Sequence, residues 1–402
     1  MNALLRYPLA LIVLAQLCGT SLWFSPNSAA DSLSAEWALT TAQFGQLTGA
    51  TQIGFILGSL ILAASGAADR FSASRIFSSA CYLGAVFNAY FALFVSDFHQ
   101  GLALRFAVGI CLAGIYPLGM KMVIGWTQTA AGSTLGLLVG MLTLGTALPH
   151  AVRAGGGDLS WHEVVLTSSL LALAGGALVQ ALGDGPYLPR ATGARAGWGA
   201  ALKAFKGPDF RATALAYFGH MWELYAFWTL VPFFINDLVN TSDVASDSNS
   251  ALAPALSFFI IGIGALGSII AGGLSKRVGS PIVAAASLGI SGLMCFAYPF
   301  ARPFGMLLCI PMLLLWGLTV ISDSAQFSAV SARACPPDLV GGALAIQNSI
   351  GFLITVFSIT LVTQSFPNIG VGVAWYLLPG PLLGLVCFIP VILKFKTSEQ
   401  NK

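Results

Sequence analysis

Five ionisable side chains lie inside long apolar stretches of this sequence, and they are the residues that could do chemistry there. They are Arg105, Lys121, His220, Glu223 and Asp323. Placing a charge inside a bilayer costs at least about 2.5–3.5 kcal/mol, so each of these side chains needs a structural or functional reason. Carboxyl and imidazole groups can exchange protons, whereas guanidinium and ammonium groups can attract an anion.

Glu223 and His220 have the spacing of a proton relay. Glu223 lies about twelve residues into its apolar stretch, which is about 18 Å at 1.5 Å per residue and close to the middle of a bilayer. Removal from water favours the protonated carboxyl group. His220 lies three residues earlier on the same helical face, and imidazole titrates near neutral pH. We expect these two residues and Asp323 to carry a coupled proton; a Glu–His pair that only ties helices together is the alternative.

Two roles are open for each of the other charged residues. Arg105 can attract an anionic substrate, or it can hydrogen-bond to carbonyl groups of a neighbouring helix. Lys121 and Asp323 lie at similar depths in their stretches, so we predict that they form an ion pair that closes an inner gate. In the alternative, Lys121 extends to the membrane interface and Asp323 pairs with Arg333.

Polar and aromatic side chains in the same stretches are candidates for contact with a substrate. Tryptophans in membrane helices are more often at the interface or in packing, but Trp222 and Tyr225 flank Glu223 and are expected to bind. The other candidates are Gln16, Trp23, Asn27, Tyr116, Trp228 and Gln326, with Gln347 and Asn348 as secondary ones.

The composition indicates which elements must position these side chains. Of the 402 residues, 56% are apolar and 8% are charged, with a mean hydropathy of +0.83. A soluble domain carries about 25% charged residues, so a soluble enzyme, a nucleic-acid binder, a disordered chain and a coiled coil are excluded. The continuous apolar runs also exclude a β-barrel. The remaining class is a helical protein that crosses the membrane several times.

Twelve apolar stretches are long enough to cross the hydrocarbon core, which takes about 20 residues each. The predicted fold is therefore an all-α polytopic membrane protein of twelve transmembrane helices. The first stretch is similar to a secretory signal peptide, but Gln16 and Asn27 favour a transmembrane helix. The stretches are 8–30, 42–64, 74–96, 100–124, 131–152, 162–183, 212–236, 250–274, 279–301, 304–327, 340–364 and 371–393.

The basic residues predict the orientation of these helices. With the N-terminus in the cytoplasm, fourteen of the eighteen Lys and Arg residues fall in inside segments. Only Arg153 and Arg302 fall in outside loops. Because Lys and Arg mark cytoplasmic loops, we expect both termini in the cytoplasm and a cytoplasmic or inner membrane as the location.

The longest predicted loop, 185–211, divides the chain into two halves of six spans, 1–184 and 212–402. A short helix lying on the membrane surface and a solvated linker are both compatible with its residues from 198 to 206. Each half has a basic turn after its second span. Arg70 and Arg277, which occupy matching places in these turns, are 207 positions apart. A duplicated half would leave such a repeat.

These turns resemble the loop motif of the major facilitator superfamily, Gly-x-Leu-x-Asp-Arg-x-Gly-Arg-Arg. The first copy keeps Asp69 and Arg70, with Arg75 as a further basic residue. The second copy keeps Arg277 but has Lys276 in place of the acidic residue. The resemblance implies two pseudo-symmetric six-helix bundles that rock about a central site and open alternately to each side. It implies a structural or gating role for these five loop residues, in addition to the gate that the depths of Lys121 and Asp323 predict.

Two further features bear on this resemblance. Arg105, followed by Gly109, is similar to a second element of the family. The family likeness places spans one, four, seven and ten around the central cavity, and all five buried ionisable residues fall on spans four, seven or ten. Span five carries Gly132, Gly136, Gly140 and Gly145 and is similar to a glycine-rich helix of family exporters, but it lacks their Gly-Pro pair. Close helix packing is therefore the favoured explanation.

The sequence predicts a proton-coupled secondary transporter of a small organic solute. Arg105 and Lys121 in one half face Glu223 and Asp323 in the other, which favours an organic anion or a zwitterion. The alternative is a proton-antiport exporter of lipophilic drugs or metabolites. HExxH, GxSxG and Walker motifs do not occur, and the seven cysteines have no metal-site or disulfide spacing. We therefore expect no enzyme, cofactor, metal or nucleic acid, and a monomer whose partners are substrate, protons and lipid.

Overall fold

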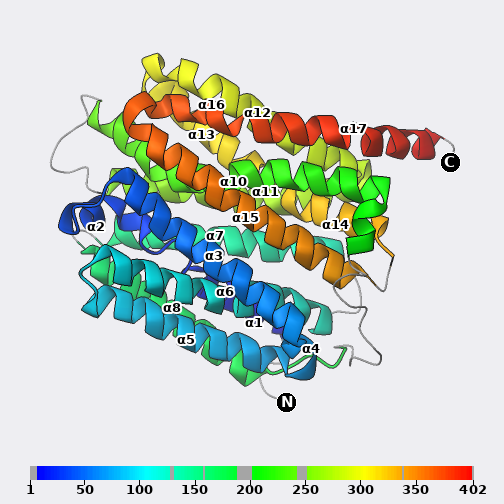
Figure 1. Cartoon of the computed structure of the whole chain (residues 1–402), viewed down its shortest axis with the longest axis horizontal. Helices are drawn as coiled ribbons and strands as arrows, with labels where there is room; N and C mark the ends of the chain where they lie inside the picture. The colour runs from blue at the N-terminus through cyan, green and yellow to red at the C-terminus, as the bar shows by residue number, and fades with distance from the viewer. Residues whose placement is uncertain are drawn as a thin grey trace.

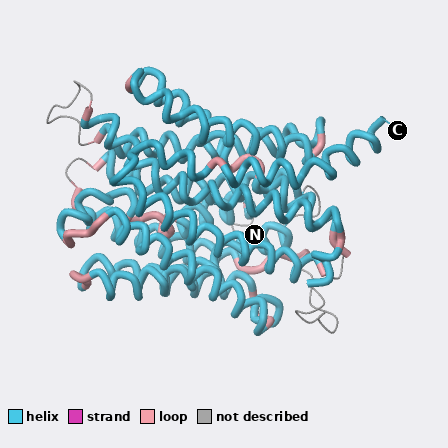
Figure 2. Tube along the Cα trace, turned by 45° about the horizontal axis from the view of Figure 1, so that its top comes forward, coloured by secondary structure: helices cyan, strands magenta, loops and turns pink. Residues whose placement is uncertain are grey.

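The protein is a bundle of long helices in the computed structural model. The structure describes residues 7–126, 131–156, 159–187, 202–241, 251–336 and 339–400, and contains no β-strand among them. The helices lie roughly side by side, with most of the connecting loops gathered at the two ends of the bundle (Figure 2). The helices before residue 187 occupy the lower part of Figure 1, and those after residue 202 occupy the upper part.

The elements of the first part pack mainly on one another. They are α1 (Pro8–Thr20), η2 (Asn27–Ala29), α2 (Ala30–Glu36), α3 (Thr41–Ser65), α4 (Ala67–Arg70), α5 (Ala73–Phe94), α6 (Phe98–Trp126), α7 (Ala131–Gly155) and α8 (Trp161–Leu182).

The elements of the second part continue the chain after the 188–201 segment, which lies outside the described residues. They are η3 (Leu202–Lys206), α10 (Pro208–Asn240), α11 (Leu252–Val278), α12 (Ser280–Ala301), η5 (Arg302–Phe304), α13 (Met306–Val320), α14 (Ser324–Ala334), α15 (Val340–Ile369), η6 (Gly370–Val373), α16 (Ala374–Leu377) and α17 (Pro379–Gln400). A surface helix was one of two possibilities for residues 198–206, and the part of this segment that the structure describes is the 3₁₀ turn η3.

Local sequence signals explain where several helices begin and end. Thr40 and Gln43 form a capping box at the start of α3, and Ser160 and Glu163 form another at the start of α8. In each box the two residues satisfy backbone and side-chain donors reciprocally. Helix α3 ends at Gly66, whose φ of 67° is in the left-handed region that glycine adopts without strain.

Three predicted spans are interrupted rather than continuous. Span 8–30 stops at Thr20 and turns through 21–26, where Pro26 lacks the N–H that a helix needs. Span 304–327 is divided into α13 and α14 at 321–323, where the hydroxyl group of Ser322 donates to the carbonyl oxygen of Leu318 at 2.6 Å and so competes with the backbone for a hydrogen bond. Span 371–393 begins with the short η6 and α16, and Pro379 then starts α17.

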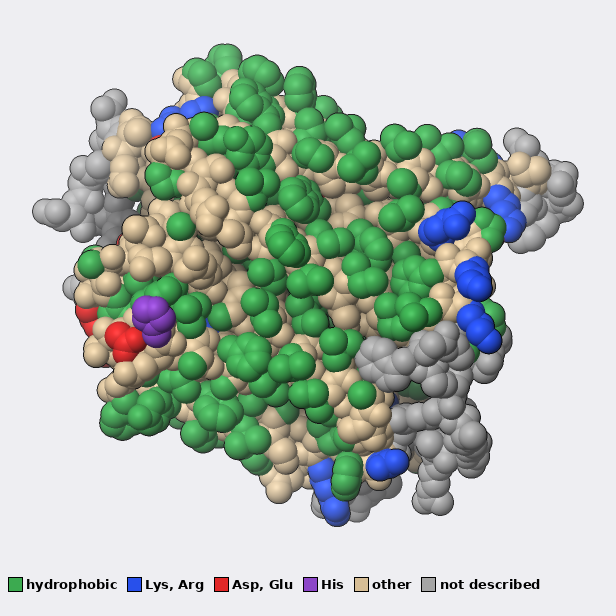
Figure 3. Space-filling view, viewed as in Figure 1, with side chains coloured by type: hydrophobic (Ala, Val, Ile, Leu, Met, Phe, Trp, Pro, Cys, Tyr) green, Lys and Arg blue, Asp and Glu red, His purple; other side chains and the backbone are tan. Residues whose placement is uncertain are grey.

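Most of the described helices have the length and composition of membrane spans. Among the described residues, nine stretches are long and apolar enough to cross a membrane. On the face seen in Figure 3, apolar side chains cover a broad central band. Lys and Arg gather mainly at the end near the C-terminus, and acidic side chains lie at the opposite end.

Two helix pairs join the two parts of the chain: α7 packs against α11, and α3 packs against α15. At the first seam, a Cβ added to Gly140 would lie 3.0 Å from the carbonyl oxygen of Ala265. This close approach places Gly140 in helix packing, as small residues in membrane helices allow. The site described next lies between these two seams.

Candidate functional site

A small cavity of about 50 Å³ lies between the two parts of the chain. It is bordered by α6, α7, α10, α14 and α15, together with the break between α13 and α14. Its polar lining consists of Tyr116, Tyr217, Tyr225, Ser324, Ser328 and Asn348. Tyr116, Tyr225 and Asn348 are among the residues selected from the sequence, whereas Tyr217 and the two serines are not.

A layer of aromatic rings closes this cavity on one side. The layer consists of Trp23 from the turn after α1, Phe55 from α3, Tyr225 from α10 and Phe352 from α15. The ring centroids of Phe55 and Phe352 are 4.4 Å apart, and those of Trp23 and Tyr225 are 5.6 Å apart. The indole nitrogen of Trp23 donates to Gln52 Oε1 at 3.1 Å, which holds the ring in place. Aromatic contacts at these separations are attractive, so the layer forms a closed barrier.

Glu223 lies behind the cavity rather than in its wall. It is fully buried, and its carboxylate accepts three hydrogen bonds from helices of the same part. Trp316 Nε1 lies 2.6 Å and Cys295 Sγ 3.3 Å from Oε1, and Ser291 Oγ lies 2.9 Å from Oε2. Three donors aimed at two oxygens suit an ionised carboxylate. The group therefore ties α10 to α12 and α13 while it is unprotonated.

His220 and Asp323 form a second buried polar pair. Nδ1 of His220 lies 2.8 Å from Oδ1 of Asp323, and both side chains are at most 1% exposed. The separation is that of an ion pair, but the contact lacks the geometry of a hydrogen bond. Nε2 of His220 is buried without a hydrogen-bond partner among the described residues. Asp323 sits at the break between α13 and α14, so the pair joins α10 to an irregular point of the chain.

Asp323 and Lys121 do not form the predicted gate in this conformation. The described ion-pair partner of Asp323 is His220, and the charge that attracts Lys121 is Asp184, which follows α8. Arg333 donates to Ser280 Oγ at 3.1 Å and is not described as a partner of Asp323. The reason is position: Asp323 faces α10 in its own part of the chain.

Arg105 makes hydrogen bonds to carbonyl groups, which was one of the two roles that the sequence left open. It is 1% exposed, and Nη2 donates to the carbonyl oxygens of Leu22 at 3.0 Å and Trp23 at 2.7 Å. Nη1 donates to Asn88 Oδ1 at 2.9 Å. These carbonyls lie where the chain leaves α1 and have no helical partner, so the guanidinium satisfies them inside the bundle. Arg105 does not line the cavity.

Asn88 was missed by the sequence analysis, although it is central to this network. Its Nδ2 donates to the carbonyl oxygen of Val165 at 2.9 Å and to Ser169 Oγ at 3.0 Å. It thereby links α5 to α8 as well as to Arg105. A lone amide within the predicted span 74–96 was the available signal, because a polar side chain in a membrane helix needs partners.

Trp222 points away from the cavity, against expectation. Its indole nitrogen donates to the carbonyl oxygen of Tyr376 at 2.8 Å, and the ring packs beside Gly380 of α17. Successive helical residues are rotated by 100°, so a residue next to Glu223 need not share a face with Tyr225. Trp228 does lie near the aromatic layer, with its ring centroid 5.2 Å from that of Tyr225.

The remaining polar candidates are buried but do not border the cavity. Gln16 and Gln347 have amide groups without a hydrogen-bond partner among the described residues. Gln326 is 4% exposed on α14. Asn27 Nδ2 donates to Thr48 Oγ1 at 3.0 Å and lines a second space, of about 20 Å³, beyond the aromatic layer. His150, which the sequence analysis did not select, lines this space with its Nε2 unpartnered among the described residues.

Two other residues that line this second space hydrogen-bond to each other. The amide nitrogen of Asn236 on α10 lies 2.9 and 2.8 Å from the two carboxylate oxygens of Asp31 on α2. This contact joins the two parts of the chain. Nearby, Arg302 Nε donates to Asp237 Oδ2 at 2.6 Å, and this hydrogen bond raises the pKa of Arg302.

Comparison with known proteins identifies the family. The family model of the major facilitator superfamily matches residues 11–359. The chain belongs to this superfamily. It is therefore a transport protein of the membrane and not an enzyme. Among the solved structures that it resembles is the nucleoside transporter NupG, crystallised as a mutant, with a TM-score of 0.70 and 16% identity over 97% of this chain and all of that one. No curated protein matches the sequence.

The superfamily loop residues lie at the surface in this member. Arg70, Arg75, Lys276 and Arg277 are exposed, and their side chains make no hydrogen bond or ion pair that the structure describes. Asp69 belongs to α4, but its side chain lies outside the described part. The gating role that the superfamily resemblance implies for these residues therefore stays a prediction. No group of three potential metal ligands occurs among the described residues.

Proposed function

We propose that this protein is a proton-coupled secondary transporter that moves a small organic solute across the cytoplasmic or inner membrane by alternating access. The observation that carries the proposal is the arrangement of α10. One face of this helix supplies Tyr217 and Tyr225 to the cavity, while the adjoining face holds His220 and Glu223 in buried polar contacts. A single rigid helix thus links a solute site to acid–base groups.

Protonation of Glu223 is the proposed coupling step. A proton on the carboxyl group removes its negative charge and weakens the hydrogen bonds from Trp316, Ser291 and Cys295, since charge-assisted bonds are about twice as strong as neutral ones. Helix α10 is then held less tightly to α12 and α13. His220 lies one turn from Glu223 on the same helix, and its pair with Asp323 is the proposed relay or alternative proton site.

The proposed topology has twelve membrane crossings, with both termini in the cytoplasm and two bundles, 1–184 and 212–402, joined by the linker 185–211. Nine described stretches qualify by length and composition. The count of twelve adds α1, which has only 13 residues, and α10, which carries the buried ionisable groups. It also divides the last stretch into α15 and the segment that ends with α17. The concentration of basic residues at one end supports the orientation (Figure 3).

The cavity lining narrows the proposed solute to an uncharged or zwitterionic molecule that bears a ring. Arg105 was the main argument for an organic anion, but its described donors are taken up by Leu22, Trp23 and Asn88. The polar lining consists of phenol, hydroxyl and amide groups, which hydrogen-bond without attracting net charge. Nucleosides have this chemistry, and a structural neighbour transports them, so they are the first class to test.

The exporter remains as a second candidate because half of the cavity lining is apolar. Met120, Val139, Leu142, Met221 and Leu224 contribute to it. Methionine adapts to ligands of different shape, and such a surface suits a lipophilic solute. The direction of proton movement relative to the solute separates the two candidates.

The decisive experiment measures proton movement in proteoliposomes that contain a pH-sensitive dye. Nucleosides, amino acids, organic anions and lipophilic cations are added in turn, and wild type is compared with Glu223→Gln. Glu163→Gln is the matched control, because Glu163 is an exposed capping residue and glutamine can also cap. Solute-dependent proton flux that is lost only in Glu223→Gln supports the proposal. Solute uptake without proton movement in wild type contradicts it.

A further inference from the structure

A groove on the outer surface of the first bundle is separate from the site between the bundles. It has a volume of about 540 Å³ and lies where α3, α5 and α6 meet, with the segment from Arg70 to Arg75 at its edge. None of its lining residues borders the central cavity. Its volume is within the range of about 300–1,000 Å³ that small-molecule sites occupy.

The wall of this groove is apolar and faces the surrounding lipid. Ile61 is 52% exposed, Leu83 54% and Phe71 65%. Exposed apolar side chains of this size belong in hydrocarbon. A molecule in the groove is therefore reached from the membrane, and its main body must be apolar.

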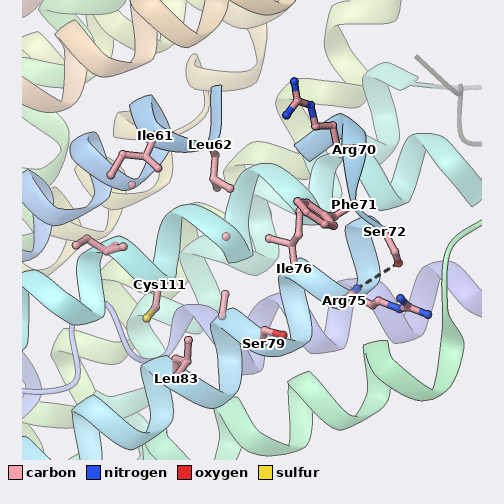
Figure 4. Close-up of a pocket in the computed structure, with 14 residues that line it drawn as sticks. Ile61, Leu62, Arg70, Phe71, Ser72, Arg75, Ile76, Ser79, Leu83 and Cys111 are labelled. Atoms are coloured by element: carbon pink, nitrogen blue, oxygen red, sulfur yellow. Dashed lines mark hydrogen bonds between the residues drawn. The ribbon is translucent and has the colours of Figure 1, made fainter. Parts of the chain in front are cut away.

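Positive charge is confined to one end of the groove. Figure 4 shows Arg70 and Arg75 at the end formed by the turn before α5, whereas Ile61, Leu83 and Cys111 lie toward the other end. Ser72 lies between the two arginines in the sequence and also lines the groove. Both guanidinium groups are exposed and make no hydrogen bond or ion pair with a described residue. Guanidinium groups bind phosphate oxygens with paired donors.

We propose that this groove binds an anionic phospholipid of the leaflet at the basic end of the protein. The phosphate lies against Arg70 and Arg75, and an acyl chain lies along Ile61 and Leu83. The charge complementarity and the opening toward lipid select this occupant over a soluble solute. Because the turn with Arg70 and Arg75 joins two helices of the first bundle, the lipid would link membrane composition to the position of these helices.

The test is native mass spectrometry of the purified full chain, incubated with phosphatidylglycerol or phosphatidylcholine of identical acyl chains. The double variant Arg70→Gln/Arg75→Gln removes the charges, and Leu83→Trp fills the apolar part while leaving both charges. The control is Lys276→Gln/Arg277→Gln, which changes the corresponding turn of the second bundle. All variants are first checked for a single peak in size-exclusion chromatography; if the double variant fails this check, each arginine is replaced singly.

We expect wild type and the control to retain phosphatidylglycerol in preference to phosphatidylcholine. The arginine variant should bind it about 30-fold more weakly, from the attraction of two basic residues to anionic lipid. Leu83→Trp should also lose it, because the acyl chain no longer fits. Equal retention of both lipids by wild type would overturn the proposal. So would loss in the control double variant, or retention by Leu83→Trp, which would mean that the lipid is held by surface charge alone.

Discussion

At the scale of single residues, the side chains of α10 point in different directions and meet different surroundings. Tyr217, Met221 and Tyr225 border the cavity, Glu223 faces α12 and α13, and Trp222 contacts the α16–α17 region. A helix turns by 100° per residue, so adjacent residues can serve three different surroundings. Solute binding and proton binding can therefore be altered independently on this helix.

This separation predicts different effects for two neighbouring substitutions. Tyr225→Leu should raise the KM for the solute about tenfold or more, because it removes a ring and a hydroxyl group from the cavity wall. Trp222→Leu should leave KM close to that of wild type and lower only stability, since it removes packing against α17. Solute uptake at a series of concentrations measures both. A larger rise in KM for Trp222→Leu than for Tyr225→Leu would contradict the assignment of faces.

Replacing Arg105 should lower the stability of the protein without changing its affinity for the solute. Arg105→Gln leaves the buried carbonyl oxygen of Trp23 without its described donor, and an unpaired buried polar group costs about 1–3 kcal/mol. We expect a lower melting temperature in detergent. The folded fraction should bind solute with unchanged affinity. An unchanged melting temperature together with weaker solute binding would return Arg105 to the solute site.

At the scale of elements, glycines determine how closely the helices approach. A Cβ added to Gly109 of α6 would lie 2.1 Å from the carbonyl oxygen of Thr51, and one added to Gly54 of α3 would lie 2.0 Å from that of Phe106. Each glycine thus meets the backbone of the other helix, which cannot move aside as a flexible side chain can. The arginine-to-glycine spacing that resembles a family element therefore combines a hydrogen-bonding residue with a packing residue.

Gly109→Ala should separate α3 from α6. Overpacking of this kind costs about 1–3 kcal/mol, so we expect lower yield and a lower melting temperature. Gly273→Ala is the matched control, because a Cβ at Gly273 meets no atom within 4 Å. Equal melting temperatures for the two variants, measured in the same detergent, would show that α3 and α6 do not meet through Gly109.

The interrupted helices carry polar contacts at their breaks. The turn after α1 exposes carbonyl groups that Arg105 satisfies, and the break between α13 and α14 places Asp323 beside His220. Irregular backbone within a membrane protein is stable only where protein or water satisfies it. Substrate sites of transporters commonly occur at such breaks. The cavity residue Ser324 directly follows Asp323, and the cavity residue Tyr225 lies five residues after His220.

At the scale of the whole molecule, two sets of contacts join the two bundles at one end of the central cavity. The aromatic layer and the contact between Asp31 and Asn236 close that end, while the cavity lies on the other side of the layer. The proposed alternating access requires these contacts to separate. The same contacts should therefore report on the conformational cycle.

Locking this end should stop transport reversibly. The double variant Asp31→Cys/Asn236→Cys, joined by a short thiol-specific cross-linker, should lose more than about 90% of solute uptake. The cross-link holds this end closed, so the protein cannot reach the state that is open there. A reductant that cleaves the linker should restore uptake. Each single variant treated in the same way is the control. Full uptake by the cross-linked double variant would show that Asp31 and Asn236 stay together during transport.

Much of this architecture could be predicted from sequence patterns alone, without knowing which residues contact each other. The apolar stretches, the basic turns and the ionisable residues on spans four, seven and ten are visible in the sequence, and the superfamily assignment was confirmed. The Lys121–Asp323 ion pair and the cavity role of Trp222 were not found in this conformation. Both contacts depend on which way a side chain points, which a residue's depth along a helix does not determine.

The sequence by itself determined that this protein is a helical membrane protein, because apolar length and low charge leave a chain few other stable forms. Its two basic turns added the resemblance to the superfamily that the comparison confirmed. The tertiary structure alone decided the partners of each buried polar group. His220 meets Asp323 across 103 positions of the chain, and Arg105 reaches Trp23 across 82. Such contacts depend on helix rotation and on where helices break, and these are set by the packing of all the helices together.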